Sequence, residues 1–101
     1  MLENIEKYAR DFNIPIMQKE GIDFLTDFIK KNNVKTILEI GTAIGYSAIK
    51  MALVDDDIKI ISIERDQERY NEAVKNIKLF NLQNRIKLIY NDAFNVDLTE
   101  K

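Results

Sequence analysis

The sequence contains no cysteine and no histidine, and it has only three glycines and one proline among 101 residues. Without cysteine or histidine the chain can form no disulfide, no zinc finger and no nucleophile triad built on those residues. No apolar run approaches the roughly 20 residues of a membrane-spanning helix, and the N-terminus lacks the apolar core of a signal peptide. We therefore expect a cytoplasmic protein with no membrane partner.

An excess of charge of one sign is also lacking. Fifteen basic and seventeen acidic residues give a formal net charge of −2, and no long basic block offers a surface that could follow a phosphate backbone. Composition alone therefore suggests no nucleic-acid partner. An apolar content of 46% is ordinary for a globular fold, and a chain of this length can build one domain with a modest core.

The chain does contain a regular alternation of helical and strand patterns. Apolar residues at three- and four-residue spacing predict helices over about 2–12, 18–31 and 47–54, and between Asp66 and Asn81. Short apolar runs rich in β-branched residues predict strands at 35–40, 58–64 and 85–90. Asp66 is placed to cap its helix, asparagines follow the helices that end near residues 12 and 31, and Asn81 offers a left-handed stop. The order of elements predicts right-handed crossovers and a parallel α/β sheet in the order 3-2-1.

A glycine-containing turn, EIGTAIG from Glu39 to Gly45, follows the first predicted strand. Ligands of open α/β sheets bind beyond the carboxyl ends of the strands, so this turn is a candidate binding loop. The dinucleotide pattern G-x-G-x-x-G fails, because Ala43 and Tyr46 stand at its second and third glycine positions. No Gly-Lys-Ser/Thr follows, which excludes a P-loop. A dehydrogenase is therefore the least favoured enzyme class.

The turn reads E-x-G-x-A-x-G and resembles motif I of S-adenosylmethionine-dependent methyltransferases, whose usual form is D/E-x-G-x-G-x-G. With PIMQKEG at 15–21, LEIGTAIGYSAIKMA at 38–52 and IERDQERYNEAVKNI at 63–77, the chain resembles the metal-dependent O-methyltransferases that include catechol and caffeoyl-CoA methyltransferases. It is most similar to the bacterial branch that contains tRNA 5-hydroxyuridine methyltransferase. The resemblance implies an incomplete Rossmann-like fold, in which 1–101 is the N-terminal cofactor-binding part of a single domain.

Two acidic residues at strand ends are candidate ligand contacts on their own chemistry. Glu39 can hold the turn by accepting backbone N–H bonds, or it can accept a water-mediated bond from a ligand amine. Glu64 lies close to the ~20-residue offset after the glycine turn at which an acid reads ribose hydroxyls in Rossmann-like folds. We therefore expect both carboxylates at one crevice.

The resemblance implies the remaining assignments. It places Gly41 and Gly45 at close approach to the cofactor, Met17 over it, Ser47 at its methionine moiety, and Asp92 with Ala93 at its adenine. The implied cofactor is S-adenosylmethionine, and the implied metal is Mg²⁺ or another divalent cation. The metal ligands and the catalytic residue of the family have no counterpart within 1–101.

Simpler structural roles stand beside several of these assignments. Met17 is also an ordinary core residue, Ser47 a helix cap, Asp92 a turn cap, and we interpret Tyr46 as a packing residue outside the site. The first methyl acceptor that the resemblance implies is 5-hydroxyuridine of tRNA, and the alternative is a small catechol-like molecule. A noncatalytic nucleotide-binding fragment is the alternative from another class, because no catalytic residue lies within the chain.

The first predicted strand has one edge without a partner. Unpaired apolar edges favour association, so we expect the chain to dimerise through this edge, to aggregate or to fold poorly alone. The family resemblance separately implies a homodimer.

Overall fold

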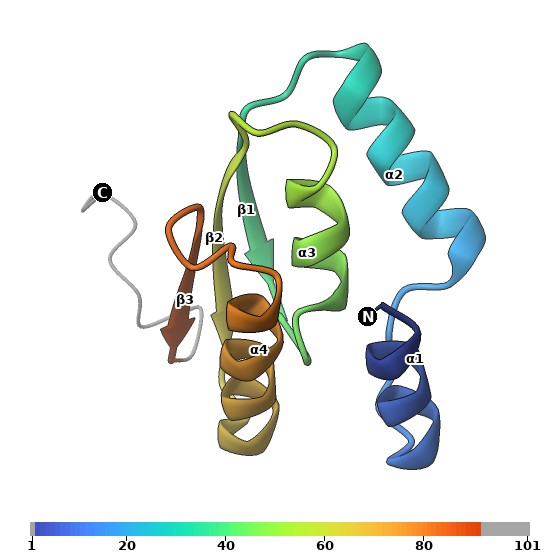
Figure 1. Ribbon diagram of the computed structural model, residues 1–101, viewed down its shortest axis with the longest axis vertical. Coiled ribbons are helices and arrows are strands. Elements are labelled where there is room, and N and C mark those ends of the chain that lie inside the picture. The colour runs from blue at the N-terminus through green and yellow to red at the C-terminus, as the bar shows by residue number, and fades with distance from the viewer. Residues whose placement is uncertain (1, 92–101) are drawn as a thin grey trace.

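The computed structural model describes residues 2–91, and the helices and strands follow one another there in the predicted order (Figure 1). The elements are α1 (Leu2–Asp11), α2 (Lys19–Lys31), β1 (Thr36–Ile40), α3 (Tyr46–Ala52), β2 (Lys59–Glu64), α4 (Gln67–Leu79) and β3 (Ile86–Tyr90). Asp92 and Ala93, expected at the adenine, lie outside the described residues.

The three strands form a parallel sheet in the order β1-β2-β3, which confirms the predicted arrangement. The register places Glu39 of β1 beside Ser62 of β2. Glu39 and Ser62 lie on the face of the sheet that packs against α3 and α4, and Ile60 and Ile86 on the same face belong to the core. Helices α1 and α2 lie beyond α3, farther from the sheet (Figure 1). The carboxyl ends of the strands therefore meet the turn that leads into α3.

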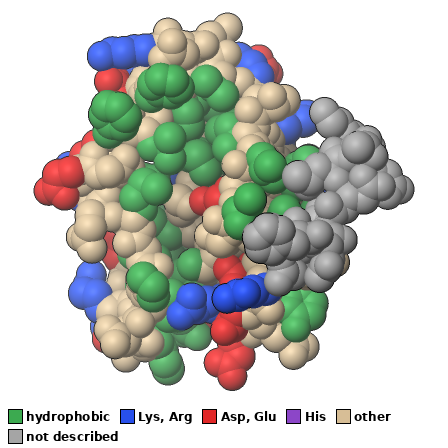
Figure 2. All heavy atoms as spheres, turned by 180° about the vertical axis from the view of Figure 1, so that it is seen from behind, with side chains coloured by type: hydrophobic (Ala, Val, Ile, Leu, Met, Phe, Trp, Pro, Cys, Tyr) green, Lys and Arg blue, Asp and Glu red, His purple; other side chains and the backbone are tan. Residues whose placement is uncertain are grey.

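The opposite face of the sheet is largely apolar and is open along β1. Leu38 is 49% exposed and Ile40 is 66% exposed, although both belong to the first strand. The register puts Ile61 and Ile89 on the same face. Figure 2, which views the molecule from behind, shows apolar side chains gathered over this side. No helix within residues 2–91 covers them, and the outer edge of β1 pairs with no strand of that range.

The ends of the helices follow the predicted local chemistry. The Asp66 side chain accepts a hydrogen bond from the backbone N–H of Arg69 at 3.0 Å and so caps α4. Asn81 has a φ angle of 58°, which confirms the left-handed stop after α4, and Asn33 after α2 is left-handed too, with a φ of 53°. Phe28 is different: its spacing from Ile22 and Leu25 predicts that it faces the core with them, but it is half exposed.

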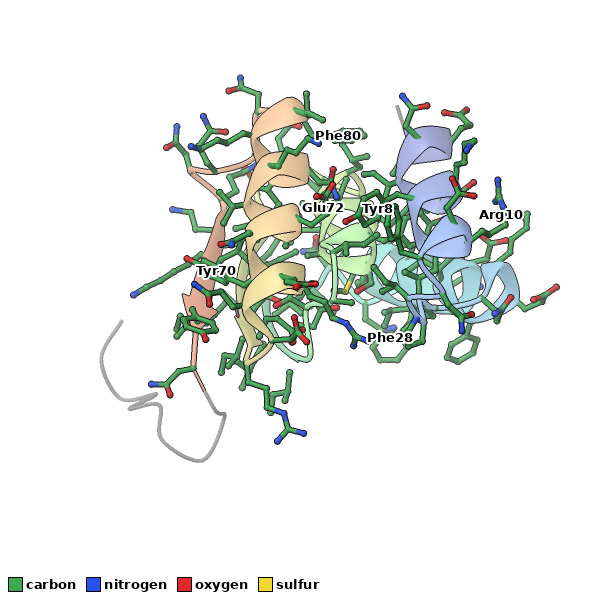
Figure 3. The ribbon with its side chains drawn as sticks, turned by 90° about the horizontal axis from the view of Figure 1, so that it is seen from below. Tyr8, Arg10, Phe28, Tyr70, Glu72 and Phe80 are labelled. Atoms are coloured by element: carbon green, nitrogen blue, oxygen red, sulfur yellow. The ribbon has the colours of Figure 1, made fainter. Side chains whose placement is uncertain are left out.

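Side chains far apart in the sequence hold the outer elements together. One guanidinium nitrogen of Arg85 donates to the carbonyls of Ala52, Asp55 and Ile58 and thereby closes the loop between α3 and β2. Figure 3 shows Tyr8 of α1 and Glu72 of α4 side by side where those two helices approach. Within residues 2–91, no helix is both long enough and apolar enough to cross a bilayer.

Candidate functional site

The turn between β1 and α3 bends through three left-handed residues. Gly41, Ala43 and Gly45 have φ angles of 87°, 52° and 90°. A side chain at such an angle costs about 1–2 kcal/mol, so the alanine in this E-x-G-x-A-x-G turn occupies a conformation that favours glycine. The N–H groups of Gly41 and Thr42 both donate to the Ile63 carbonyl, at 2.8 and 3.2 Å. The turn is thus fastened to β2.

The two glycines of the turn have different surroundings. A Cβ on Gly41 would meet no atom within 4 Å, so this side of the backbone faces open space. A Cβ on Gly45 would lie 3.5 Å from the backbone of Ala73, because α4 passes directly against the start of α3. Gly41 therefore leaves room for a ligand, whereas Gly45 is favoured by its positive φ, because a Cβ there would make only an ordinary contact with α4.

A buried network of hydroxyl groups surrounds the carboxylate of Glu39. Ser62 donates to Glu39 Oε1 at 2.7 Å, and Ser47 donates to Glu39 Oε2. The hydroxyls of Ser62 and Thr42 are 2.5 Å apart. Burial raises the pKa of the Glu39 carboxyl, the two serine hydrogen bonds lower it, and the nearby charge of Glu64 raises it, with a net upward shift.

Glu64 is buried at the end of β2 and binds backbone groups. Its Oε1 accepts from the N–H of Ala43 at 2.7 Å, and its Oε2 accepts from the N–H of Asp66 at 2.9 Å. Of the two roles predicted for Glu39, acceptance of a backbone N–H bond from the turn belongs to Glu64 instead. The bond supports the left-handed conformation of Ala43.

A cavity of about 460 Å³ opens beside the turn. Its walls come from the segment before α2, from β1 with the turn, and from α3, and they include Met17, Glu39, Gly41 and Ser47. The structure thus brings four of the predicted site residues together. Gly45 and Glu64 support the loop from behind and do not line this cavity. The volume lies within the usual range for small-molecule sites.

Another cavity in the described part of the chain, about 950 Å³, lies between α1, α2 and α3. It contains neither Glu39 nor the glycine turn, so its size does not make it the better candidate. Tyr46 lines both cavities and is only 6% exposed. Its hydroxyl donates to Glu6 at 2.7 Å, and burial together with that bond raises its pKa to about 12.

Three residues that reasoning from the sequence left out belong to this region. Ser62 and Thr42 complete the network around Glu39, and Tyr46, which does pack in the core as expected, also forms a wall of the cavity. Ser62 carried a usable signal, because a lone hydroxyl inside the apolar strand KIISIE requires a buried partner. Tyr46 carried none beyond its position.

The cavity suits a ligand that has both a cationic and an apolar part. The Glu39 carboxylate can accept from an ammonium group, and Ile16, Met17 and Leu38 provide apolar walls. Gly41 leaves space for the ligand against the backbone. Between residues 2 and 91, no three acidic side chains lie close enough to hold a metal ion.

Comparisons with known proteins identify relatives of this arrangement. The sequence model of a family described as O-methyltransferase matches residues 1–100. Flavonoid 3′,5′-methyltransferase of Vitis vinifera is 35% identical over 91 residues, which is 89% of this chain and 37% of the relative.

Solved structures give the same result. A candidate caffeoyl-CoA O-methyltransferase from Staphylococcus aureus is 35% identical with a TM-score of 0.90, over 93% of this chain and 45% of that one. An O-methyltransferase from Bacillus cereus in complex with S-adenosylhomocysteine (SAH) is 26% identical with a TM-score of 0.83, over 93% and 44%. The chain therefore spans less than half the length of these relatives.

Proposed function

The chain belongs to the O-methyltransferase family, and we propose from this premise that the protein transfers a methyl group from S-adenosylmethionine to a hydroxyl oxygen. The observation that carries the proposal is the cavity in which Glu39, Gly41, Ser47 and Met17 meet at the end of β1. A relative of similar fold binds SAH, the product of such a transfer. Residues 1–101 would form the N-terminal cofactor-binding part of a single domain.

Each described site residue has a role in this proposal. Glu39 receives the ammonium of the cofactor's amino-acid part, Gly41 admits the ligand against the backbone, and Met17 covers it from the segment before α2. Ser47 orients Glu39 through its hydrogen bond and lies at the methionine moiety. When bound, S-adenosylmethionine supplies an activated methyl group that moves from sulfur to oxygen in one displacement. The described residues bind and orient; we assign them no proton transfer.

Glu64 and Gly45 act from behind the loop. Glu64 holds Ala43 in its left-handed conformation. Each of its carboxylate oxygens has a second lone pair, and we propose that these lone pairs accept hydrogen bonds from the ribose hydroxyls. Gly45 adopts the positive φ with which the turn enters α3. Asp92 and Ala93 keep their proposed place at the adenine.

The described residues do not fit the divalent cation that the family resemblance implies. No cluster of three possible metal ligands occurs in the range 2–91. If the protein uses Mg²⁺ or a similar ion, we propose that the ligands come from elsewhere in the protein.

The methyl acceptor is the finer part of the proposal. We place a small hydroxylated aromatic molecule first, because relatives are named for flavonoid and caffeoyl-CoA substrates. The 5-hydroxyuridine of tRNA is second and rests on the resemblance of 15–21, 38–52 and 63–77 to the bacterial branch. A cytoplasmic homodimer completes the proposal. Its support is the uncovered apolar edge of β1 and the family resemblance.

Calorimetric titration with SAH tests the cofactor assignment. The protein should bind SAH, and Glu39→Gln should weaken binding roughly 10- to 100-fold, since a hydrogen bond to a charged group contributes about 1.5–3 kcal/mol. Glu20→Gln is the matched control, because it makes the same change at an exposed position of α2. A folded wild-type protein that gives no heat with millimolar SAH contradicts the proposal. Methyl transfer to catechol against tRNA lacking the modification then identifies the acceptor class.

A further inference from the structure

Ser62 is a hydroxyl residue fully buried in the central strand. It is 0% exposed and stands among Ile60, Ile61 and Ile63. An apolar strand gains nothing from a hydroxyl at such a position unless the hydroxyl is bonded, because burying an unbonded one costs about 1–3 kcal/mol. The serine therefore points to a specific role for its hydrogen bonds.

The direction of these bonds follows from donor and acceptor chemistry. An ionised Glu39 only accepts, so the single proton of Ser62 must go to Glu39 Oε1, at 2.7 Å. Ser62 Oγ can then only accept from Thr42, at 2.5 Å. The result is a one-way chain, Thr42 to Ser62 to Glu39, in which every hydroxyl proton has a fixed place.

The chain ties the carboxylate to two elements at once. Thr42 is 2% exposed and belongs to the turn, whose backbone donates to the Ile63 carbonyl, while Ser62 belongs to β2. Ser47 at the start of α3 donates to the other carboxylate oxygen. With both oxygens held from different sides, Glu39 has little freedom to rotate away from the cavity that it lines.

We propose that Ser62 is a positioning residue for the cofactor: together with Thr42 it orients the Glu39 carboxylate toward the ammonium group of the amino-acid part of S-adenosylmethionine. The inference rests on the proposed function. It deepens that function by adding Ser62, which does not line the cavity and acts through Glu39. It also separates the amino-acid end of the ligand, which depends on Ser62, from the nucleoside end, which does not.

Two ligands that differ only at the amino-acid end test the role. SAH carries the amino acid, whereas 5′-methylthioadenosine keeps the nucleoside and thioether without it. Calorimetry on Ser62→Ala should show about tenfold weaker SAH binding and unchanged methylthioadenosine binding. Ser62→Cys keeps a side chain of similar size with a weaker donor, so its affinity for SAH should lie between those of wild type and Ser62→Ala. Thr26→Ala removes a hydroxyl that bonds Ile22 within α2 and should change neither affinity.

Equal losses for both ligands in Ser62→Ala would show a structural role only, and unchanged SAH binding would show no role, so either result overturns the inference. If Ser62→Ala does not fold, Thr42→Val removes the preceding donor with little change of shape, and it should weaken SAH alone by about threefold. Wild-type protein that binds neither ligand defeats the proposed function as well. If wild-type protein binds both ligands and the variants bind them with the same affinities, only the role of Ser62 is overturned.

Discussion

The two faces of the sheet differ in how far their side chains are buried and hydrogen-bonded. On the face toward α3 and α4, apolar residues are buried, and the carboxylates of Glu39 and Glu64 have hydrogen-bond partners. No buried polar side-chain atom in the described residues lacks a partner. On the other face, Leu38 and Ile40 of β1 are exposed. The difference teaches that the side-chain hydrogen bonds around the glycine turn come from one face, whereas Leu38 and Ile40 of the other face contribute only exposed apolar surface at the rim of the cavity.

The largest expected effect comes from removing one isoleucine from each face. Ile60→Ala, at a site 1% exposed, should lower the free energy of unfolding by about 2–5 kcal/mol through lost burial and a cavity. Ile40→Ala, at a site 66% exposed, should lower it by about 0.5 kcal/mol or less. Urea unfolding monitored by circular dichroism measures both.

Similar losses at the two positions would break this comparison. They would mean that the open face is covered in solution, for example by a second copy of the chain. Light scattering on the wild-type protein and on Ile40→Lys distinguishes the cases, since a charge at the edge of β1 should favour the monomer if copies associate there.

A smaller effect is expected inside the turn. Gly45→Ala places a Cβ at a φ of 90° and 3.5 Å from Ala73, and it should destabilise the protein by about 1–2 kcal/mol. Ala43→Gly relieves a φ of 52° but makes the unfolded chain more flexible, so its net effect should be within about 1 kcal/mol of zero. Thermal unfolding of the two variants measures the contrast. A neutral Gly45→Ala would show that the turn can relax out of this positive φ at little cost.

Local chemistry made much of this fold predictable. Helix ends are marked by the side-chain and backbone preferences of Asp66, Asn33 and Asn81. The helical connections between consecutive strands favour parallel neighbours, as found in the sheet. The exposure of Phe28 was not predictable in the same way, because periodicity shows that a residue is apolar and not whether a partner covers it.

The site was predictable in position and less so in its bonds. Glu39 lies near the end of β1, Gly41 follows the strand directly, and both line the cavity. The exchange of partners between Glu39 and Glu64 depends on strand register, which brings Ser62 beside Glu39, and on the path of the turn past β2. Neither can be read from spacing along one strand. Tyr46 likewise reaches the cavity only through the packing of α3 against α1 and α2.

The smallest effect on stability, and the sharpest contrast with function, is expected at Glu39 itself. Burial raises the pKa of this carboxyl above its value in the unfolded chain. Protonation of Glu39 therefore favours the folded state. This contribution to the free energy of unfolding is fully present below the pKa of the unfolded chain, and it is lost as the pH rises through the pKa of the folded protein. Glu64 is the neighbouring charge that adds to the shift, while Ser47 and Ser62 oppose it.

Glu39→Gln should thus leave the protein slightly more stable than wild type at pH 7 and remove that part of the pH dependence, although it weakens SAH binding. The glutamine can still accept from Ser62 and donate to Ser47, so the network stays satisfied. Urea unfolding at pH 4 and pH 7 measures the effect, and the difference between variant and wild type should grow with pH. A variant less stable than wild type at pH 7 would show that the ionised carboxylate stabilises the covered face. The charge of Glu39 would then stabilise the fold, instead of costing some stability in return for the proposed binding of SAH.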